Sequence, residues 1–185
     1  MQLDKAIQER KSVKRFKEKK PDWRDIIECI DSARYAPMAG NIFSMRFILI
    51  EDKDVIQKIA DAAQQDFVAQ AKYVVVACSR PKQTVNAYGS QGKIYCRQQA
   101  GAAIQNFLLS IEQKGLATCW VGHFVERMIK QALQIPGDID VEAVFPIGYQ
   151  LDKKFTKKTK TDLDRALFFH KYGNKRKREP VNIKA

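Results

Sequence analysis

The spacing of apolar residues along the chain predicts alternating helices and strands. Apolar side chains recur every three or four positions in residues 22–35 and 54–67, which is typical of amphipathic helices. Asp22 is suited to cap the first of these helices, and Pro37 cannot continue it. Two further helices are expected, over residues 3–10 and 126–133.

Runs of branched and aromatic residues predict strands. The clearest run is 73–78, which contains three consecutive valines, and 46–51 is also too apolar for an exposed edge. Shorter strands are expected over 116–121 and 141–149. We expect Pro146 to break the last strand near its end.

One polar stretch interrupts this alternation. Residues 79–93 contain Pro81, Gly89 and Gly92 among polar side chains. Proline and glycine in such a setting favour a loop, so we expect no helix or strand there. The stretch is short for an elaborate lid over a bound substrate.

The longest helix is expected over residues 95–114, with Gly115 in the C-cap position. Its central turns, 100–111, are apolar almost all round. Such a helix lies in a core or at a subunit interface. Gln105 and Asn106 interrupt the apolar surface, and buried amides need partners. We expect those partners across a subunit interface or on a bound cofactor.

Composition narrows the class of protein. The chain has 185 residues, 45% hydrophobic and 29% charged, which fits a single globular domain. No apolar run reaches the roughly 18 residues that a membrane span needs. The first residues lack the apolar core of a signal peptide, so we expect a cytoplasmic protein without a membrane partner.

The cysteines and histidines point away from a metal site. Four cysteines are spread along the chain without close spacing, and only two histidines are present. Metal sites usually show closely spaced ligands, so we expect none. Cys119 has no basic neighbour in sequence that would lower its pKa, so it is not expected to be a catalytic thiol.

The net charge of +12 resides at the two ends of the chain. Residues 5–24 carry +6 and residues 153–185 carry +9, whereas residues 25–152 carry −2. An anion-binding site is therefore expected to draw on the ends. The glycines match neither a dinucleotide-binding fingerprint nor a P-loop.

Four short stretches, taken in this order along the chain, resemble the motifs of a known protein family. Residues 10–16 read RKSVKRF, 36–41 read APMAGN, 115–122 read GLATCWVG and 146–149 read PIGY. Together they resemble the FMN-dependent nitroreductase family. The resemblance implies an α+β fold with a mainly antiparallel central sheet flanked by helices, assembled as an intertwined homodimer. It implies an FMN-binding domain and a basic C-terminal extension, with bounds at 1–165 and 166–185.

The first stretch contains the donors that a phosphate dianion needs. Arg10 offers a planar fork, Ser12 a hydroxyl and Lys14 a point charge, although a solvated basic face is an alternative interpretation. In the family, this stretch contacts the phosphate, the ribityl chain and the pyrimidine edge of the flavin. The resemblance thus implies cofactor contacts for Arg10, Lys11, Ser12 and Lys14. It also implies, more loosely, that a later basic pair reaches the phosphate, namely Lys158 and Lys160.

The second stretch consists mainly of small residues, which let a backbone lie against a flat ring. A plain helix-to-strand turn explains it equally well from the residues alone. The resemblance implies that the turn contacts the isoalloxazine ring bound by the partner subunit. Met38 replaces the serine that is usual there. The expected contacts come from Pro37, Met38, Ala39, Gly40 and Asn41.

The third stretch is expected at the reactive edge of the flavin. The resemblance implies that Trp120, Val121 and Gly122 lie there, where backbone N–H groups can tune hydride exchange at N5. A core position for Trp120 is compatible with this role. No side chain needs to act as an acid or a nucleophile, and we assign no catalytic residue.

The resemblance implies an FMN-dependent oxidoreductase that passes electrons from NAD(P)H through flavin N5 to an acceptor in two half-reactions. The acceptor would be a nitro compound, a quinone or a similar conjugated molecule. Basic charge is compatible with NADPH, but no residue is assigned to its extra phosphate.

Two alternatives stay open. The same fold and cofactor could serve reductive dehalogenation or flavin breakdown. Alternatively, the basic tail, with Lys171 and residues 175–178, could bind nucleic acid or an acidic partner without catalysis. Few aromatic residues lie among those cations, which makes nucleic acid the weaker option.

Overall fold

The computed structural model describes residues 2–152 and 161–177. They belong to two compact units, Met1–Asp152 and Lys153–Ala185. In the second unit, helix α7 (Leu163–Ala166) precedes a turn in which the rings of Phe168 and Tyr172 lie 4.7 Å apart. Lys158 and Lys160 lie outside the described residues.

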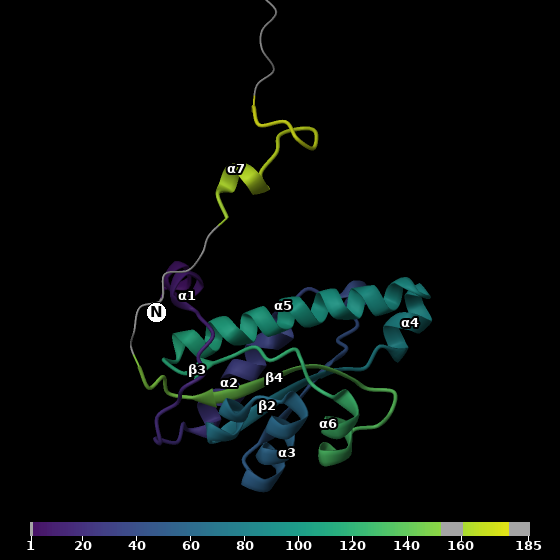
Figure 1. The fold of residues 1–185 in the computed structure, drawn as a ribbon. Coiled ribbons are helices and arrows are strands. Elements are labelled where there is room, and N and C mark those ends of the chain that lie inside the picture. Colours follow the sequence, from purple (N-terminus) through teal and green to yellow (C-terminus); the bar gives the residue numbers. More distant parts are fainter. Residues whose placement is uncertain (1, 153–160, 178–185) are drawn as a thin grey trace, which may run out of the picture. The chain divides into compact units, whose positions relative to one another are not determined.

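The first unit contains nearly all the helices and strands expected from the sequence (Figure 1). Its α-helices are α1 (Leu3–Glu9), α2 (Trp23–Ser32), α3 (Lys53–Ala63), α4 (Lys82–Tyr88), α5 (Gln91–Gln113) and α6 (Glu126–Leu133). Its 3-10 helices are η1 (Ala33–Tyr35), η2 (Ala39–Asn41) and η3 (Asp66–Gln70). Its strands are β1 (Met45–Ile50), β2 (Tyr73–Ser79), β3 (Ala117–Thr118) and β4 (Asp140–Gly148).

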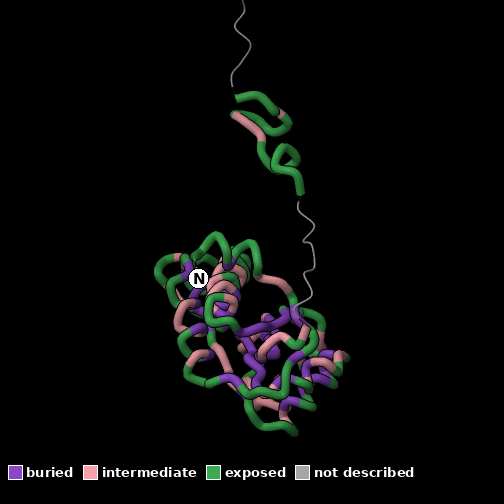
Figure 2. The backbone as a smooth tube through the Cα atoms, turned by 90° about the vertical axis from the view of Figure 1, so that its left-hand side faces the viewer, coloured by how far each residue is buried: buried purple, intermediate pink, exposed green. Residues whose placement is uncertain are grey.

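The four strands form one antiparallel sheet in the order β1-β2-β4-β3, which confirms the expected α+β class. Helices α2 and α5 cover one face, and α3 and α6 cover the other (Figure 1). Both faces of β2 are therefore buried, as its unbroken apolar sequence predicts. Figure 2 shows buried residues concentrated in the interior of this unit.

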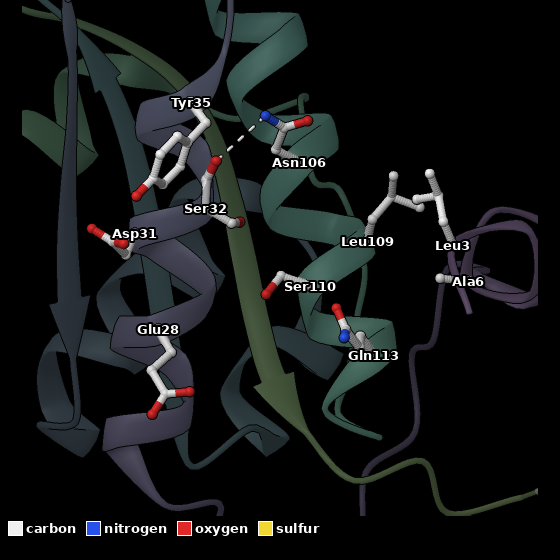
Figure 3. A pocket seen from close by; sticks show the side chains of 10 residues that line it. All are labelled: Leu3, Ala6, Glu28, Asp31, Ser32, Tyr35, Asn106, Leu109, Ser110 and Gln113. Carbon is white, nitrogen blue, oxygen red and sulfur yellow. Dashed lines mark hydrogen bonds between the residues drawn. The ribbon is translucent and has the colours of Figure 1, made fainter. Parts of the chain in front are cut away.

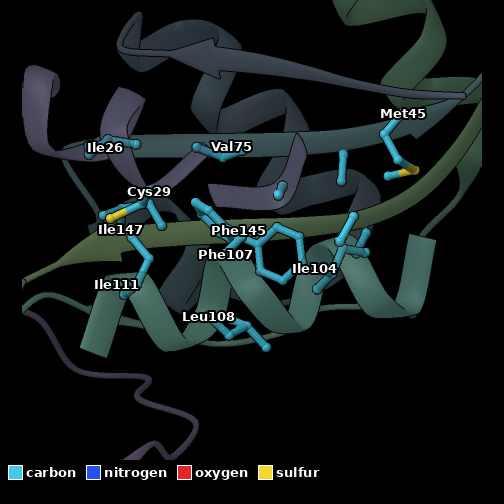
Figure 4. Packing of buried hydrophobic residues seen from close by; sticks show 14 of the residues in the cluster. Ile26, Cys29, Met45, Val75, Ile104, Phe107, Leu108, Ile111, Phe145 and Ile147 are labelled. Atoms are coloured by element: carbon cyan, nitrogen blue, oxygen red, sulfur yellow. The ribbon is translucent and has the colours of Figure 1, made fainter. Parts of the chain in front are cut away.

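Alternate residues of β2 supply the two cores. Val75 joins the cluster under α5, whereas Val74 joins the cluster under α3. Under α5, Phe107 packs edge-on against Phe145 of β4 with ring centroids 5.4 Å apart (Figure 4). Asp22 caps α2 as expected, since its carboxylate accepts a hydrogen bond from the Arg24 N–H at 2.9 Å.

The prediction of a loop over residues 79–93 is wrong, because α4 lies within this stretch. Pro81 precedes the first turn of the helix, where its missing N–H has no intrahelical role. Gly89, with φ of +59°, ends the helix. Gly92 begins the close packing of α5 on α4, since a Cβ there would lie 2.4 Å from the Thr84 carbonyl oxygen. The three apparent loop residues therefore start, stop and pack a short helix.

The expected break at Pro146 is also wrong, because β4 continues through it. The Val144 N–H donates to Val121 on the β3 side at 2.9 Å. Position 146 faces the same side, since backbone groups alternate along a strand. There it lies opposite Cys119, just beyond the end of the short edge strand β3. The missing N–H thus falls outside the paired part of β3, where a proline is tolerated.

The two amides of α5 differ from the expectation. Asn106 donates from Nδ2 to the Ser32 carbonyl at 3.3 Å, so its partner lies in the same chain. Gln105 is exposed. Across residues 2–152 and 161–177, no helix has both the length and the apolar character that a membrane crossing requires.

Candidate functional site

Three of the four family-like stretches meet at one edge of the sheet. Ser12 forms a parallel bridge with Thr118, whose carbonyl accepts a hydrogen bond from the Val13 N–H at 2.9 Å. The chain then pairs with the segment after β4, where the Lys17 N–H donates to the Tyr149 carbonyl at 2.8 Å. We call this region the assembled edge, and it comprises residues 10–17, 117–122 and 148–151.

A close contact between Phe16 and Gly148 fixes this edge. A Cβ on Gly148 would lie 2.8 Å from Cδ1 of the Phe16 ring, so only glycine leaves the ring its place. Phe16 is 8% exposed and packs in a small apolar cluster with Val13, Ala71 and Ala117. The phenylalanine of the first stretch and the glycine of the fourth therefore depend on each other.

Two cations of the first stretch have no carboxylate partner within the described residues. They are Arg10, partly buried at the end of α1, and Lys14, whose Nζ lies 5.1 Å from the centre of the Phe67 ring. By contrast, Arg15 pairs with Asp152 at 2.6 Å, and Lys20 pairs with Glu51. The uncompensated charge at the edge is suited to a bound anion.

The hydroxyl of Thr118 is another group that lacks a partner. Thr118 is 5% exposed, and among the described residues its Oγ1 makes no hydrogen bond. A buried hydroxyl left unpaired costs roughly 1–3 kcal/mol, so such groups usually face a ligand, an ion or water. Thr118 is bridged to Ser12, which lies between Arg10 and Lys14 in the sequence.

The chain after Thr118 directs backbone donors outward. Val121 and Val144 exchange both hydrogen bonds, at 3.0 and 2.9 Å, so the Val121 N–H is already used. The N–H groups of Trp120 and Gly122 face away from β4 because successive groups alternate. Trp120 is 42% exposed, and its ring packs 5.8 Å from Phe145. Trp120 therefore packs against the core with its ring and remains partly exposed at the surface.

The second stretch lies elsewhere, against α4 and α5. Gly40 and Asn41 have φ values of +56° and +57°, which make a tight left-handed turn. A Cβ on Gly40 would lie 2.6 Å from the hydroxyl oxygen of Tyr88. Asn41 is exposed. Residues 37–41 are called the flavin turn below, after the contact that the resemblance implies.

Gln99 of α5 holds the chain just beyond the flavin turn. Its Oε1 accepts hydrogen bonds from the Ser44 N–H at 2.8 Å and from the Ser44 hydroxyl at 2.6 Å. Its Nε2 donates to the Ile42 carbonyl at 3.2 Å. Gln99 is only 4% exposed, so these bonds are shielded from water.

Within one chain, the flavin turn and the start of the assembled edge lie apart. The turn is held near Gln99, whereas β3 follows the C-terminal end of α5. The fourteen steps along α5 from Gln99 to Gln113, its last residue, correspond to about 21 Å of helix at 1.5 Å per residue. The predicted site residues thus fall into two groups, one beside the N-terminal half of α5 and one beyond its C-terminal end.

A cavity of about 500 Å³ lies on the face formed by α1, α2, η1 and α5 (Figure 3). Its acidic residues already have partners, since Glu28 pairs with Lys114 and Asp31 pairs with Arg34 at 2.6 Å. The hydrogen bond from Lys114 to Glu28 raises the pKa of that lysine. None of the described residues that line the cavity is a lysine or an arginine, so this lining does not suit a phosphate.

The cysteines are buried and free. Burial raises the pKa of the Cys78 thiol to about 11 and also raises that of Cys29. Neither is a thiolate near neutral pH. In the part of the chain that the structure describes, no group of histidine, cysteine and carboxylate side chains is placed to hold a metal ion.

The sequence did not single out three residues of these two regions. Thr118 lies inside the third stretch but is the one buried hydroxyl there. Gln99 is an amide on a largely apolar helix, and such an amide indicates hydrogen bonds to the backbone of a neighbouring segment. Tyr88 lies in the supposed loop, where nothing in the pattern marked it.

The model of the Nitroreductase family matches residues 7–67 and 62–149. The chain belongs to the Nitroreductase family. A protein of Archaeoglobus fulgidus, provisionally named as an NADH dehydrogenase/NAD(P)H nitroreductase, is 29% identical over 155 residues, which cover 81% of this chain and 86% of that protein. The expected family is therefore confirmed.

Solved structures confirm the nitroreductase fold. The crystal structure of a nitroreductase family protein from Clostridium novyi NT matches 94% of this chain and 96% of its own, with a TM-score of 0.76 and 28% identity. Iodotyrosine deiodinase, solved with FMN and 3-iodo-L-tyrosine, matches 87% of this chain and 96% of its own. That match has a TM-score of 0.75 and 21% identity, and it concerns the fold alone.

Proposed function

We propose that this member of the Nitroreductase family is an FMN-dependent oxidoreductase, which passes electrons from NAD(P)H to a nitro compound, a quinone or a similar conjugated acceptor. The observation that carries the proposal is the assembled edge. Within the described residues, it brings together two cations without a carboxylate partner (Arg10 and Lys14), the buried Thr118 hydroxyl without a hydrogen bond, and outward N–H groups. Support also comes from the name of the Archaeoglobus relative and from the FMN in the deiodinase.

The first stretch fits the phosphate of FMN. The guanidinium of Arg10 can bind two phosphate oxygens, and Lys14 adds a positive charge without a competing carboxylate among the described residues. Ser12 is exposed and can donate its hydroxyl. Lys158 and Lys160 remain predicted donors to the same phosphate.

The segment after β3 fits the flavin ring. Thr118 would gain the hydrogen-bond partner that it lacks within the described chain. Gly122 is exposed and has no side chain, so a ring can approach the backbone closely and meet the outward N–H groups. When bound, FMN supplies the hydride-carrying chemistry. The protein binds and orients the reactants. For a quinone, NAD(P)H gives a hydride and solvent a proton, leaving NAD(P)⁺ and hydroquinone.

The active form is proposed to be a homodimer. The flavin turn of a second copy would lie on the ring held by the first, which resolves the separation of the two regions within one chain. Several large apolar side chains of α1, α2 and η1 are exposed and would be covered in a dimer, namely Leu3, Ile7, Trp23, Ile27 and Tyr35. The cytoplasmic location and the boundary after residue 165 stay predictions.

The visible absorption spectrum of the purified protein tests this function. We expect two flavin bands that bleach with NADPH or NADH under nitrogen and return when a quinone is added. Comparing the two donors at equal concentration assigns the cofactor preference. A colourless protein that FMN cannot restore would contradict the proposal.

A reductive dehalogenase is the second candidate, because iodotyrosine deiodinase shares the fold. In that reaction two electrons and a proton replace a carbon–iodine bond with carbon–hydrogen, and iodide leaves. Iodide release from 3-iodotyrosine under reducing conditions would favour it, whereas quinone reduction without iodide release favours the first candidate.

A further inference from the structure

Gln99 uses both ends of its side-chain amide on the segment that follows the flavin turn. The Ser44 N–H can only donate, and the Ile42 carbonyl can only accept. Oε1 therefore faces Ser44 at 2.8 Å, and Nε2 faces Ile42 at 3.2 Å. A neutral amide satisfies both partners at once, whereas a carboxylate at this place would satisfy only the first.

The flavin turn depends on contacts from outside it. Asn41 has a φ of +57°, and a residue other than glycine keeps such a conformation only where its surroundings impose it. The Ile42 N–H donates back to the Ala39 carbonyl at 3.1 Å, and the Ile42 carbonyl accepts from Gln99. Ile42 therefore connects the amide of Gln99 directly to the backbone of the turn.

The far end of this segment is fixed as well. The Ser44 hydroxyl donates to Oε1 of Gln99 at 2.6 Å, and the Ser44 carbonyl accepts from the Arg80 N–H at 2.9 Å. Gln99 and Ser44 are 4% and 3% exposed, so water has little access to these groups. Loss of the amide would therefore shift the chain after the turn or leave buried backbone groups unpaired.

From these contacts we propose that Gln99 is a positioning residue for FMN, which sets the place of the flavin turn and thereby the affinity for the flavin that the turn contacts. The inference rests on the proposed function, in which the assembled edge of the partner copy holds that flavin. Gln99 itself touches no reactant, because its effect passes through the backbone of Ile42 and Ser44.

The test exchanges the amide for an acid. In Gln99→Glu, an ionised carboxylate would oppose the Ile42 carbonyl oxygen, whereas the protonated acid can donate to it as the amide does. Burial raises the pKa of a carboxyl group at this position, so the change should fall between about pH 5 and about pH 8. Gln99→Met removes the donor at every pH. Gln98→Glu is the matched control, because Gln98 is exposed on the same helix.

Quenching of flavin fluorescence gives the FMN dissociation constant of each variant. Each constant is divided by the wild-type constant at the same pH, so that titration of the FMN phosphate cancels. We expect this ratio to rise about tenfold from about pH 5 to about pH 8 in Gln99→Glu, and to be about ten at every pH in Gln99→Met. In Gln98→Glu it should stay within about twofold of one.

Each outcome bears on a different claim. A ratio near one in Gln99→Met, or a ratio in Gln99→Glu that does not change with pH, would overturn the role of Gln99. The same pH dependence in Gln98→Glu would also overturn it, since the added charge alone would then explain the loss. Circular dichroism shows that each variant is folded, and Gln99→Met still decides the matter if Gln99→Glu unfolds when ionised. Wild-type protein that binds no FMN would instead contradict the proposed function, before any variant is compared.

Discussion

The assembled edge and the flavin turn are built in different ways. The edge is made by backbone pairing between segments far apart in sequence. Among the described residues, Arg10 and Lys14 have no carboxylate partner and the Thr118 hydroxyl makes no hydrogen bond. The turn is a local left-handed bend held by side chains of α4 and α5, chiefly Tyr88 and Gln99. The edge offers polar donors, whereas the turn offers a small, flat backbone surface.

This difference fits the proposal that a single chain supplies half of each site. Polar donors suit the phosphate and the hydrogen-bonding rim of a flavin, and a flat surface suits its ring face. In the proposed homodimer, the two regions would serve one flavin by combining the edge of one copy with the turn of another. The variants below perturb one region and leave the other as the reference.

The largest expected effect concerns the packing of the assembled edge. Phe16→Ala should lower the free energy of unfolding by about 3 kcal/mol, because the buried ring fills the space above Gly148. Phe16→Leu should cost about half as much, since most of the apolar volume stays. Urea titration of both variants measures the two losses, and equal losses would contradict the argument that retained apolar volume stabilises the edge.

The next effect concerns the cations. Arg10→Ala should weaken FMN binding by roughly tenfold to a hundredfold, because a charge-assisted hydrogen bond contributes about 1.5–3 kcal/mol. Lys5→Ala is the control, since Lys5 sits on exposed α1 at 3.8 Å from Glu9. Quenching of flavin fluorescence gives both dissociation constants. Similar dissociation constants for the two variants would show that Arg10 does not bind the phosphate.

A smaller effect is expected at the flavin turn. Gly40→Ala should cost roughly 1–2 kcal/mol of stability, because alanine is strained at φ of +56° and its Cβ meets Tyr88. Gly137→Ala should be close to neutral, since nothing lies within 4 Å of its added Cβ. Combining Gly40→Ala with Tyr88→Phe removes the nearest atom, so the double variant should lose less than the sum of the single losses.

The smallest effect is a difference in acid sensitivity. The hydrogen bond from Lys72 lowers the pKa of Glu18, and that from Lys20 lowers the pKa of Glu51. A lowered pKa means that stabilisation is present above the ordinary value of 4.5 and is lost as pH falls through the lowered value. These exposed pairs hold the chain after the assembled edge, whereas the uncharged Gln99 holds the turn.

Hydrogen exchange, corrected for its intrinsic pH dependence, should therefore show protection of residues 13–17 declining slightly below pH 4.5 while residues 42–44 keep theirs. The double substitution Glu18→Gln and Glu51→Gln should abolish this difference in pH dependence. Equal decline in both segments of the wild type would contradict the assignment.

The sequence predicted the assembled edge better than the turn. The unbroken apolar run of β2 indicated a buried strand, and the family-like stretches marked the segments that form the edge. The strand order, and the pairing of residues 10–17 with β3 and with the segment after β4, were not predicted. The surroundings of the turn were not predictable in the same way. The glycines at 89 and 92 and Pro81 were interpreted as loop residues, although their roles depend on tertiary packing between α4 and α5. Likewise, β4 continues through Pro146 because of the segment that lies opposite this residue in the sheet. The local sequence pattern around Pro146 does not reveal that neighbour.

The central claim is that each flavin is held by the assembled edge of one copy and the flavin turn of another. Its most direct test mixes two defective chains, Arg10→Ala and Gly40→Val, and measures FMN bound by the purified heterodimer at a concentration where neither variant alone retains it. If the site is shared, one of the two sites in the heterodimer is intact, and FMN should bind at one per dimer. If each chain forms its own site, both sites are defective, and a heterodimer without FMN would contradict the account.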